Sequence, residues 1–215
     1  MKLDLEYVKL TIHISKTSNL FHIVDQISEW NEFCHRQYVR YFENVNDGLS
    51  PRDKELLAEH RSVRKEHSWG GGLEQTFYTS LNLEQAIEAG LKEGYLKPEQ
   101  ADIERRVLMH FVPRIEKLMK NEMKTLKSFQ ERLLQEKVHM RTFAKQVSRF
   151  CHNVRPNVLV YLIANPDKWN CGGGFNGGRL TLEIPQAHDA YPNFLHELMH
   201  AFLDTQKEKL IRFTN

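Results

Sequence analysis

The sequence predicts an α+β fold in which a small mixed β-sheet accompanies a large, mostly helical N-terminal region. Three patterns in the 215 residues support this prediction. Apolar and polar residues alternate over residues 7–14, as they do in a half-buried strand. Residues 157–164 and 179–184 carry two further strand patterns. Between them, residues 16–152 place apolar side chains at spacings of three and four, which is typical of helices packed on one face.

The helical region contains several separate elements. Periodicity and capping residues predict helices over residues 19–41, 50–65 and 83–94. The second helix has the clearest start, because Ser50 is a capping residue and Pro51 follows it at the first helical position. The glycines at residues 70–72 predict a break before the third helix.

A longer helical stretch covers residues 97–152, and Pro113 predicts one interruption in it. Its apolar stripe fits either core packing within the chain or a coiled-coil surface for a partner. We favour core packing, because the stripe does not follow a strict heptad.

The C-terminal part, residues 153–215, supplies strands and the last helix. Residues 157–164 show little alternation, which suits a strand in the centre of a sheet. Residues 171–178 are rich in glycine without the Lys-Ser/Thr of a P-loop, and they predict a flexible turn or a cleft rim. Residues 179–184 alternate and stop at Pro185, which predicts an edge strand.

The motif that carries chemistry is His196-Glu197-Leu198-Met199-His200. Histidines four residues apart lie on one face of a helix, so both imidazoles can bind one Zn²⁺ while Glu197 reaches a metal-activated water. The flanking residues are apolar and predict a buried helix over residues 190–208. Burying unpaired imidazoles costs several kcal/mol, which favours metal ligands over ordinary core histidines.

This motif and its flanks resemble the zincin metallopeptidases, and specifically a gluzincin-like branch. The resemblance covers residues 157 to about 206. It implies a zinc-dependent peptidase, with His196 and His200 as metal ligands and Glu197 as general base. It also implies that an edge strand before the active-site helix pairs with an extended peptide or protein substrate.

Catalytic zinc needs three protein ligands, and the third is not evident. The metzincin pattern is excluded, because Leu203 and Gln206 stand where it requires Gly and His. We expect the third ligand beyond Asn215, in a longer protein of which this chain is a part. The upstream alternatives are His188, Cys171 and His152. Asp204 lies too far along the helix to share the ion, and fits either an orienting partner of an imidazole or a surface carboxylate.

Composition limits the remaining function classes. The net charge of +2 is small and scattered, which argues against nucleic-acid binding. The chain has no run of eighteen apolar residues and hence no predicted membrane span. The odd number of cysteines (Cys34, Cys151 and Cys171) favours reduced thiols. A single disulfide bond between two of them is the alternative. The acidic N-terminus does not resemble a signal peptide, so we expect a cytoplasmic protein or a secreted one whose signal was removed.

The sequence therefore predicts a single zincin-like domain over residues 1–215 that hydrolyses peptide bonds with zinc. A helical interaction module with a non-catalytic metal site is the competing prediction, and zinc hydrolysis of a non-peptide amide is a third. The sequence does not define the group that stabilises the oxyanion, the substrate preference or the oligomeric state.

Overall fold

The computed structural model describes residues 1–45 and 48–206. Over these residues the chain forms a mixed five-stranded sheet and eight helices, which confirms the predicted α+β class. The strands are β1 (Lys2–Leu5), β2 (Val8–His13), β3 (Asn157–Ala164), β4 (Gly173–Asn176) and β5 (Arg179–Ile184). The helices are α1 (Lys16–Ser28), α2 (Arg36–Val45), α3 (Pro51–Arg64), α4 (Gly72–Thr79), α5 (Leu83–Lys92), α6 (Pro98–Gln135), α7 (Lys137–Phe150) and α8 (Tyr191–Asp204).

The sheet has the strand order β1-β2-β3-β5-β4. The three predicted strands, β2, β3 and β5, form its parallel centre, and β1 and β4 pair antiparallel at the two edges. The prediction that residues 179–184 form an edge strand was wrong, because β4 covers the outer side of β5. The glycine-rich segment supplies this edge strand instead of a flexible turn. Gly177 and Gly178, with φ of 56° and 79°, make the tight turn that folds β4 back onto β5.

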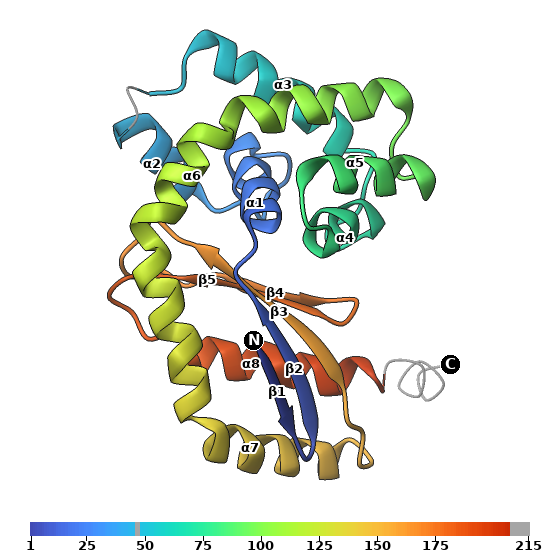
Figure 1. Cartoon of the computed structure of the whole chain (residues 1–215), viewed down its shortest axis with the longest axis vertical. Helices are drawn as coiled ribbons and strands as arrows, with labels where there is room; N and C mark the ends of the chain where they lie inside the picture. Colours follow the sequence, from blue (N-terminus) through green and yellow to red (C-terminus); the bar gives the residue numbers. More distant parts are fainter. Residues whose placement is uncertain (46–47, 207–215) are drawn as a thin grey trace.

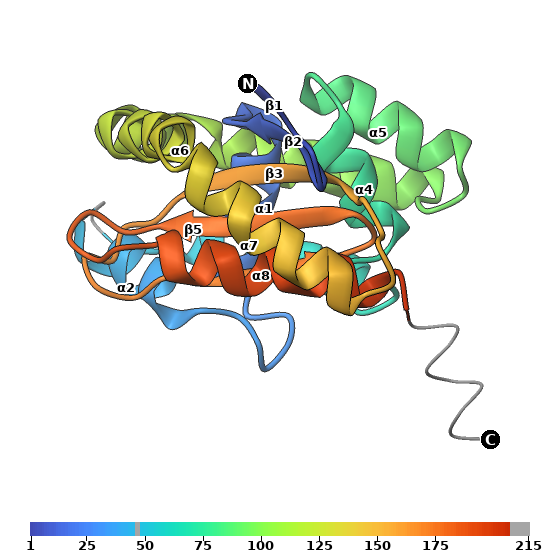
Figure 2. The same cartoon turned by 90° about the horizontal axis from the view of Figure 1, so that it is seen from below.

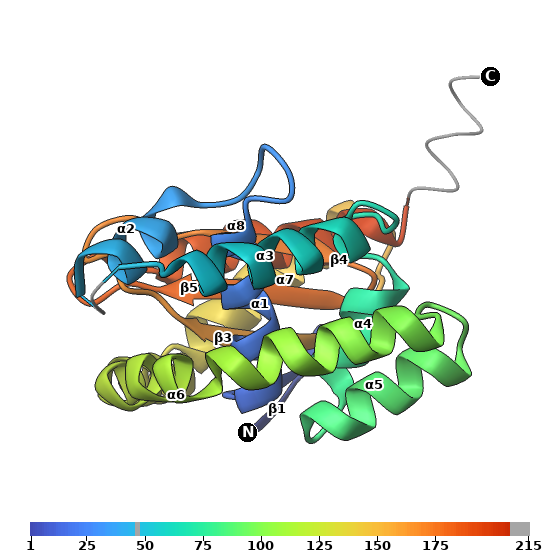
Figure 3. The same ribbon diagram turned by 90° about the horizontal axis from the view of Figure 1, so that it is seen from above.

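The helices lie on both sides of the sheet (Figure 1). Figure 2, seen from below, shows α7 and α8 in front of the strands, and Figure 3, seen from above, shows α1, α3, α4 and α5 on the opposite side. The whole helical region connects β2 to β3, which are neighbours in the sheet. The β4–β5 hairpin therefore has α8 on one face and the N-terminal helices on the other.

The first predicted helix, over residues 19–41, was wrong in extent. The chain forms two helices there, because Glu29 adopts a left-handed conformation (φ 49°) that ends α1, and α2 begins only at Arg36. The loop of residues 29–35 that separates them carries His35. The helix predicted at Ser50 is confirmed as α3, where Ser50 and Asp53 form a capping box. The short helix α4 follows the predicted break at residues 70–72 and was not predicted.

The long helical stretch also differs from its prediction. Pro113 does not interrupt it, since α6 runs through this residue and the boundary with α7 falls at Glu136 instead. In Figure 1, α6 curves along the side of the molecule, as expected of a long helix that lacks one internal hydrogen bond at a proline. The apolar stripe of α6 packs into the core, as favoured from the sequence; its buried members include Ile115, Leu118, Leu126 and Leu133.

None of the helices in the described part of the chain has both the length and the apolar character needed to cross a membrane.

Candidate functional site

Helix α8 carries the predicted metal ligands one turn apart on its exposed side. The Nε2 atoms of His196 and His200 lie 3.2 Å apart, and the two ring centroids lie 4.9 Å apart. Two nitrogens bound to one tetrahedral zinc at about 2.0–2.1 Å would be about 3.3 Å from each other. The two imidazoles therefore face each other at the separation that a shared ion requires.

The environment of these histidines differs from the prediction of a helix buried on every side. Only one side of α8 is buried, and its buried residues are Tyr191, Phe194, Leu198, Ala201 and Phe202. His196 and His200 are both exposed. The apolar neighbours of the motif face the sheet and α7, whereas nothing in residues 1–45 or 48–206 buries the two rings. Because both rings are exposed, the cost of burying unpaired imidazoles does not favour metal binding here.

Glu197 is half-buried on the flank of α8 that faces the sheet edge. A methyl group placed on Gly173 of β4 would lie 3.4 Å from Cγ of Glu197. The proposed base thus lies between the metal ligands and the edge strand. This proximity also affects Cys171, whose thiol pKa is raised to about 12, mainly by burial and in smaller part by nearby carboxylates that include Glu197.

The predicted third ligands are not brought to the histidine pair. Among the described residues, no group of three or more His, Cys, Asp or Glu side chains is arranged to hold a metal ion. His188 is exposed in the segment before α8, and His152 is exposed after α7. Cys171 instead donates through Sγ to the carbonyl oxygen of Glu183 at 3.1 Å. Asp204 is the last residue of α8, and the positions after residue 206 lie outside the described residues.

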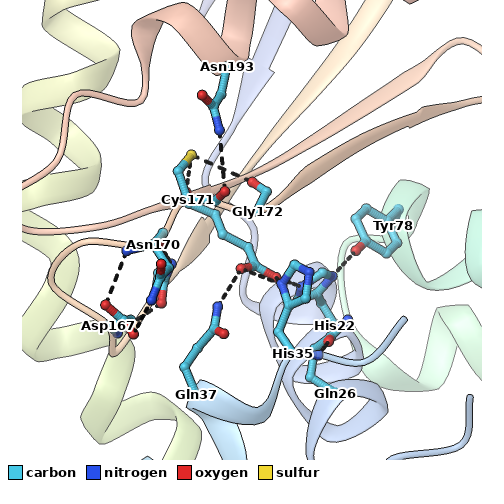
Figure 4. Close-up of polar contacts among 12 residues, drawn as sticks. His22, Gln26, His35, Gln37, Tyr78, Asp167, Asn170, Cys171, Gly172 and Asn193 are labelled. Carbon is cyan, nitrogen blue, oxygen red and sulfur yellow. Dashed lines mark hydrogen bonds and ion pairs between the residues drawn. The ribbon is translucent and has the colours of Figure 1, made fainter. Parts of the chain in front are cut away.

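A second polar group lies on the opposite face of the β4–β5 hairpin, around Glu183 of β5. The Glu183 cluster comprises Glu183, His22, His35, Gln37 and Tyr78. Its carboxylate lies 2.9 Å from Nε2 of His22 and 3.0 Å from Nδ1 of His35, and it accepts a hydrogen bond of 3.1 Å from Gln37. The Tyr78 hydroxyl lies 2.8 Å from Nδ1 of His22. Figure 4 shows these side chains converging from α1, the loop of residues 29–35, α2 and α4.

The Glu183 carboxyl is held ionised by these partners. Burial raises its pKa, but the hydrogen bonds and charges of His22 and His35 outweigh burial and lower the pKa to about 2. In return, the hydrogen bond to Glu183 raises the pKa of His35. The cluster is therefore a buried carboxylate stabilised by imidazoles.

Behind this cluster lies a fully buried ionic network, which we call the Asp25 network: Asp25, His60, Arg64 and Glu104. Asp25 accepts hydrogen bonds of 2.6 and 3.1 Å from Arg64 and lies 3.1 Å from Nε2 of His60. The other ring nitrogen of His60 lies 2.9 Å from Glu104. Burial lowers the pKa of His60, but the two carboxylates outweigh it and raise the pKa to about 9. The network joins α1, α3 and α6.

A cavity of about 570 Å³ opens between the Glu183 cluster and the edge strand. We call it the β4 pocket; residues that line it include Phe33, His35, Trp69, Glu74, Gly174 and Arg179. Arg179 is buried, donates a hydrogen bond of 2.7 Å to Gln75 and lies 3.5 Å from Glu74. The pocket and the histidine pair thus flank the same edge strand from opposite faces of the sheet.

The β4 pocket was not predicted from the sequence. One signal for it was present, because Arg179, Thr181 and Glu183 give β5 a polar face. On an edge strand that face would be solvated, but on an interior strand it must contact other polar groups. His22 and His35 carried no local signal, since they lie far along the chain from Glu183.

Comparison with protein-family models, with curated proteins and with solved structures found no match to this chain.

Proposed function

We propose that this chain is a zinc-dependent peptidase with a zincin-like arrangement of edge strand and active-site helix. The observation that carries the proposal is the 3.2 Å separation of the Nε2 atoms of His196 and His200 on an exposed helix face. That separation suits two of the three protein ligands that a catalytic zinc takes. The third ligand is not among the described residues.

The position of α8 against β4 supports a peptide as the substrate. Glu183 donates its backbone N–H to the carbonyl of Gly172 at 2.9 Å, so these two residues form a hydrogen-bonded pair. Such pairs alternate along an antiparallel ladder, and the N–H and C=O groups of Gly173 and Phe175 are consequently directed away from β5. An extended peptide can pair with these groups by strand addition, directly beside Glu197.

In the proposed mechanism the chain supplies orientation and a proton acceptor. Zinc bound by the two imidazoles would supply Lewis-acid polarisation of the scissile carbonyl and a lowered pKa for the attacking water. Glu197 takes the proton of that water on its carboxylate and later delivers it to the leaving amine. The backbone of β4 holds the peptide in register with Glu197.

The substitution Glu197→Gln tests the mechanism. We expect zinc content to stay unchanged and peptide hydrolysis to fall by at least about a hundredfold, because an amide cannot accept the proton. Zinc is measured by mass spectrometry of the zinc-loaded protein, and hydrolysis by cleavage of a quenched-fluorescence peptide library. Glu88→Gln, on the exposed side of α5, is the matched control and should change neither quantity. Undiminished hydrolysis in the Glu197 variant would refute the assigned role.

A second candidate is a helical interaction module with a non-catalytic metal site. It is favoured by the exposure of both histidines and by the lack of a third ligand among residues 1–45 and 48–206. The same experiment separates the two functions. A module of this kind would bind zinc through His196 and His200, and it would show no hydrolysis that depends on Glu197.

A further inference from the structure

We propose that the β4 pocket binds a basic side chain, Lys or Arg, of a peptide paired along β4, and so determines which substrates are accepted. This inference rests on the proposed function, because it takes the edge strand to be the peptide-binding strand. It assigns the pocket to substrate recognition and not to hydrolysis.

Neighbouring glycines on β4 open toward different faces of the sheet. A methyl group on Gly173 would meet the backbone oxygen of Thr181 at 3.1 Å and the side chains of Leu182 and Glu197, which lie on the α8 side. A methyl group on Gly174 would meet no atom within 4 Å, and this residue lines the pocket. Side chains of an added strand alternate in the same way. A peptide with one side chain facing α8 therefore directs the next one toward the pocket.

The walls of the pocket suit a long side chain with an apolar stem. Phe33, Trp69 and Tyr78 provide aromatic surface, and Trp69 is held in place by stacking on Trp30 with ring planes 14° apart. Aromatic faces attract both methylene groups and cations. The ring of Tyr78 already contacts the Arg179 guanidinium at 4.4 Å, which leaves Trp69 and Phe33 for the ligand.

The charges that face the pocket favour a cation. Its carboxylates are Glu32, Glu74 and Glu183, and they face the cationic groups of Arg179 and His35. His22 also lines the pocket but is bound between Tyr78 and Glu183. Glu183 is matched by its two imidazoles and Glu74 has Arg179 nearby, whereas Glu32 has no ion pair with any described residue, so a cation is the charge that the pocket can still accept.

Glu74 is the buried carboxylate of the pocket whose cationic partners lie furthest away. Glu183 has contacts of 3.1 Å or less from two histidines and Gln37, whereas Glu74 accepts the backbone N–H of Gly70 and has guanidinium groups only at 3.5 Å (Arg179) and 4.0 Å (Arg64). Burial raises the pKa of Glu74 more than its cationic neighbours lower it. An ammonium or guanidinium group in the pocket would supply the missing charge-assisted hydrogen bond.

Binding of synthetic peptides to the full chain tests the inference. The probes are blocked heptapeptides of alanine with one central Lys, Arg, norleucine or Glu, titrated calorimetrically without zinc so that no cleavage occurs. We expect the Lys and Arg peptides to bind at least about tenfold more tightly than the norleucine peptide, since a hydrogen bond to a charged partner is worth that much. The Glu peptide should bind most weakly.

Two variants and a control locate the effect. Gly174→Leu fills the pocket from a position with open space, so it should fold normally and lose the preference for Lys and Arg. Glu74→Gln should reduce the same preference. Glu88→Gln, on the exposed side of α5 and outside the pocket, makes the same chemical change as Glu74→Gln and should keep the ratio of Lys to norleucine affinities. Folding of each variant is checked by circular dichroism.

The results distinguish this inference from the proposed function. Equal affinities for the Lys and norleucine peptides, or an undiminished preference in Gly174→Leu, would overturn the pocket assignment. A preserved preference for Lys, together with hydrolysis that is insensitive to Glu197→Gln, would instead reject the peptidase and keep the pocket as a binding site for basic peptides.

Discussion

The histidine pair of α8 and the Asp25 network differ in how their side chains are partnered. His196 and His200 are exposed, and their Nε2 atoms lie 3.2 Å from each other. The Asp25 network on the other side is buried, and each of its ionised groups faces an opposite charge. We propose the first region as the metal site, whereas the second links α1, α3 and α6 through buried charges. The surroundings of a histidine therefore decide whether its ring is exposed or held between carboxylates.

The largest effect should come from breaking the buried network. Asp25→Ala removes the carboxylate that both Arg64 and His60 contact. His60 then keeps Glu104 alone, and the nearest carboxylate to the buried Arg64 is Glu74 at 4.0 Å. We expect the free energy of unfolding to fall by about 3–5 kcal/mol. Urea denaturation measures this loss.

The matched control is Glu55→Ala, which removes an ion pair with Arg52 whose side chains are 63% and 54% exposed. Its expected cost is below about 0.5 kcal/mol. Equal losses in the two variants would show that the buried network does not stabilise the fold more than a surface pair.

A second effect should appear in the dependence of stability on pH. Glu183 has a pKa of about 2 against an ordinary value of 4.5, so its contribution is complete above about pH 5 and is lost as the pH falls toward 2. His60 has a pKa of about 9 against 6.5, so its contribution is complete below about pH 6.5 and is lost as the pH rises through 9. We call these two losses the acidic limb and the alkaline limb of the stability curve. Each should lower the free energy of unfolding by about 3 kcal/mol.

Thermal and urea denaturation between pH 3 and 10 would reveal both limbs. The variant His60→Gln should lower stability at neutral pH and flatten the alkaline limb, while the acidic limb remains. A free energy of unfolding that stays constant from pH 6 to 10 in the wild-type chain would contradict the assigned state of His60.

The smallest effect concerns the exposed histidines in the absence of metal. His196→Ala should then change the free energy of unfolding by less than about 0.5 kcal/mol, because the ring is exposed. Zinc at about a hundred times its dissociation constant should stabilise the wild-type chain by about 2.7 kcal/mol and leave the variant unaffected. His188→Ala, another exposed histidine, should respond to zinc as the wild-type chain does. Stabilisation of the His196 variant by zinc would place the metal elsewhere.

Elements with strong local signals could be predicted from the sequence. Alternation identified β2, continuous apolar character identified β3, and the Ser50 cap with Pro51 identified the start of α3. The histidine pair belongs to the same class, because a spacing of four residues determines its geometry once the helix forms. The local signals failed at Pro113 and in the glycine-rich segment, where packing and strand pairing outweighed intrinsic preference.

The Glu183 cluster could not be predicted, because its members are distant in sequence. His22 and Glu183 are separated by 161 positions, and His35 and Glu183 by 148. No periodicity connects such residues. They meet only after β5 takes its interior position and the loop between α1 and α2 closes over it.

By itself, the sequence determined the α+β class, most of the regular elements and a helix that carries two histidines one turn apart on one face. These features depend on interactions between residues a few positions apart, which the chain carries wherever it folds. Only the tertiary structure decided that this histidine pair is exposed while other histidines are buried against carboxylates. Burial and charge pairing depend on contacts between distant segments, so they are properties of the packed molecule and not of any single stretch of sequence.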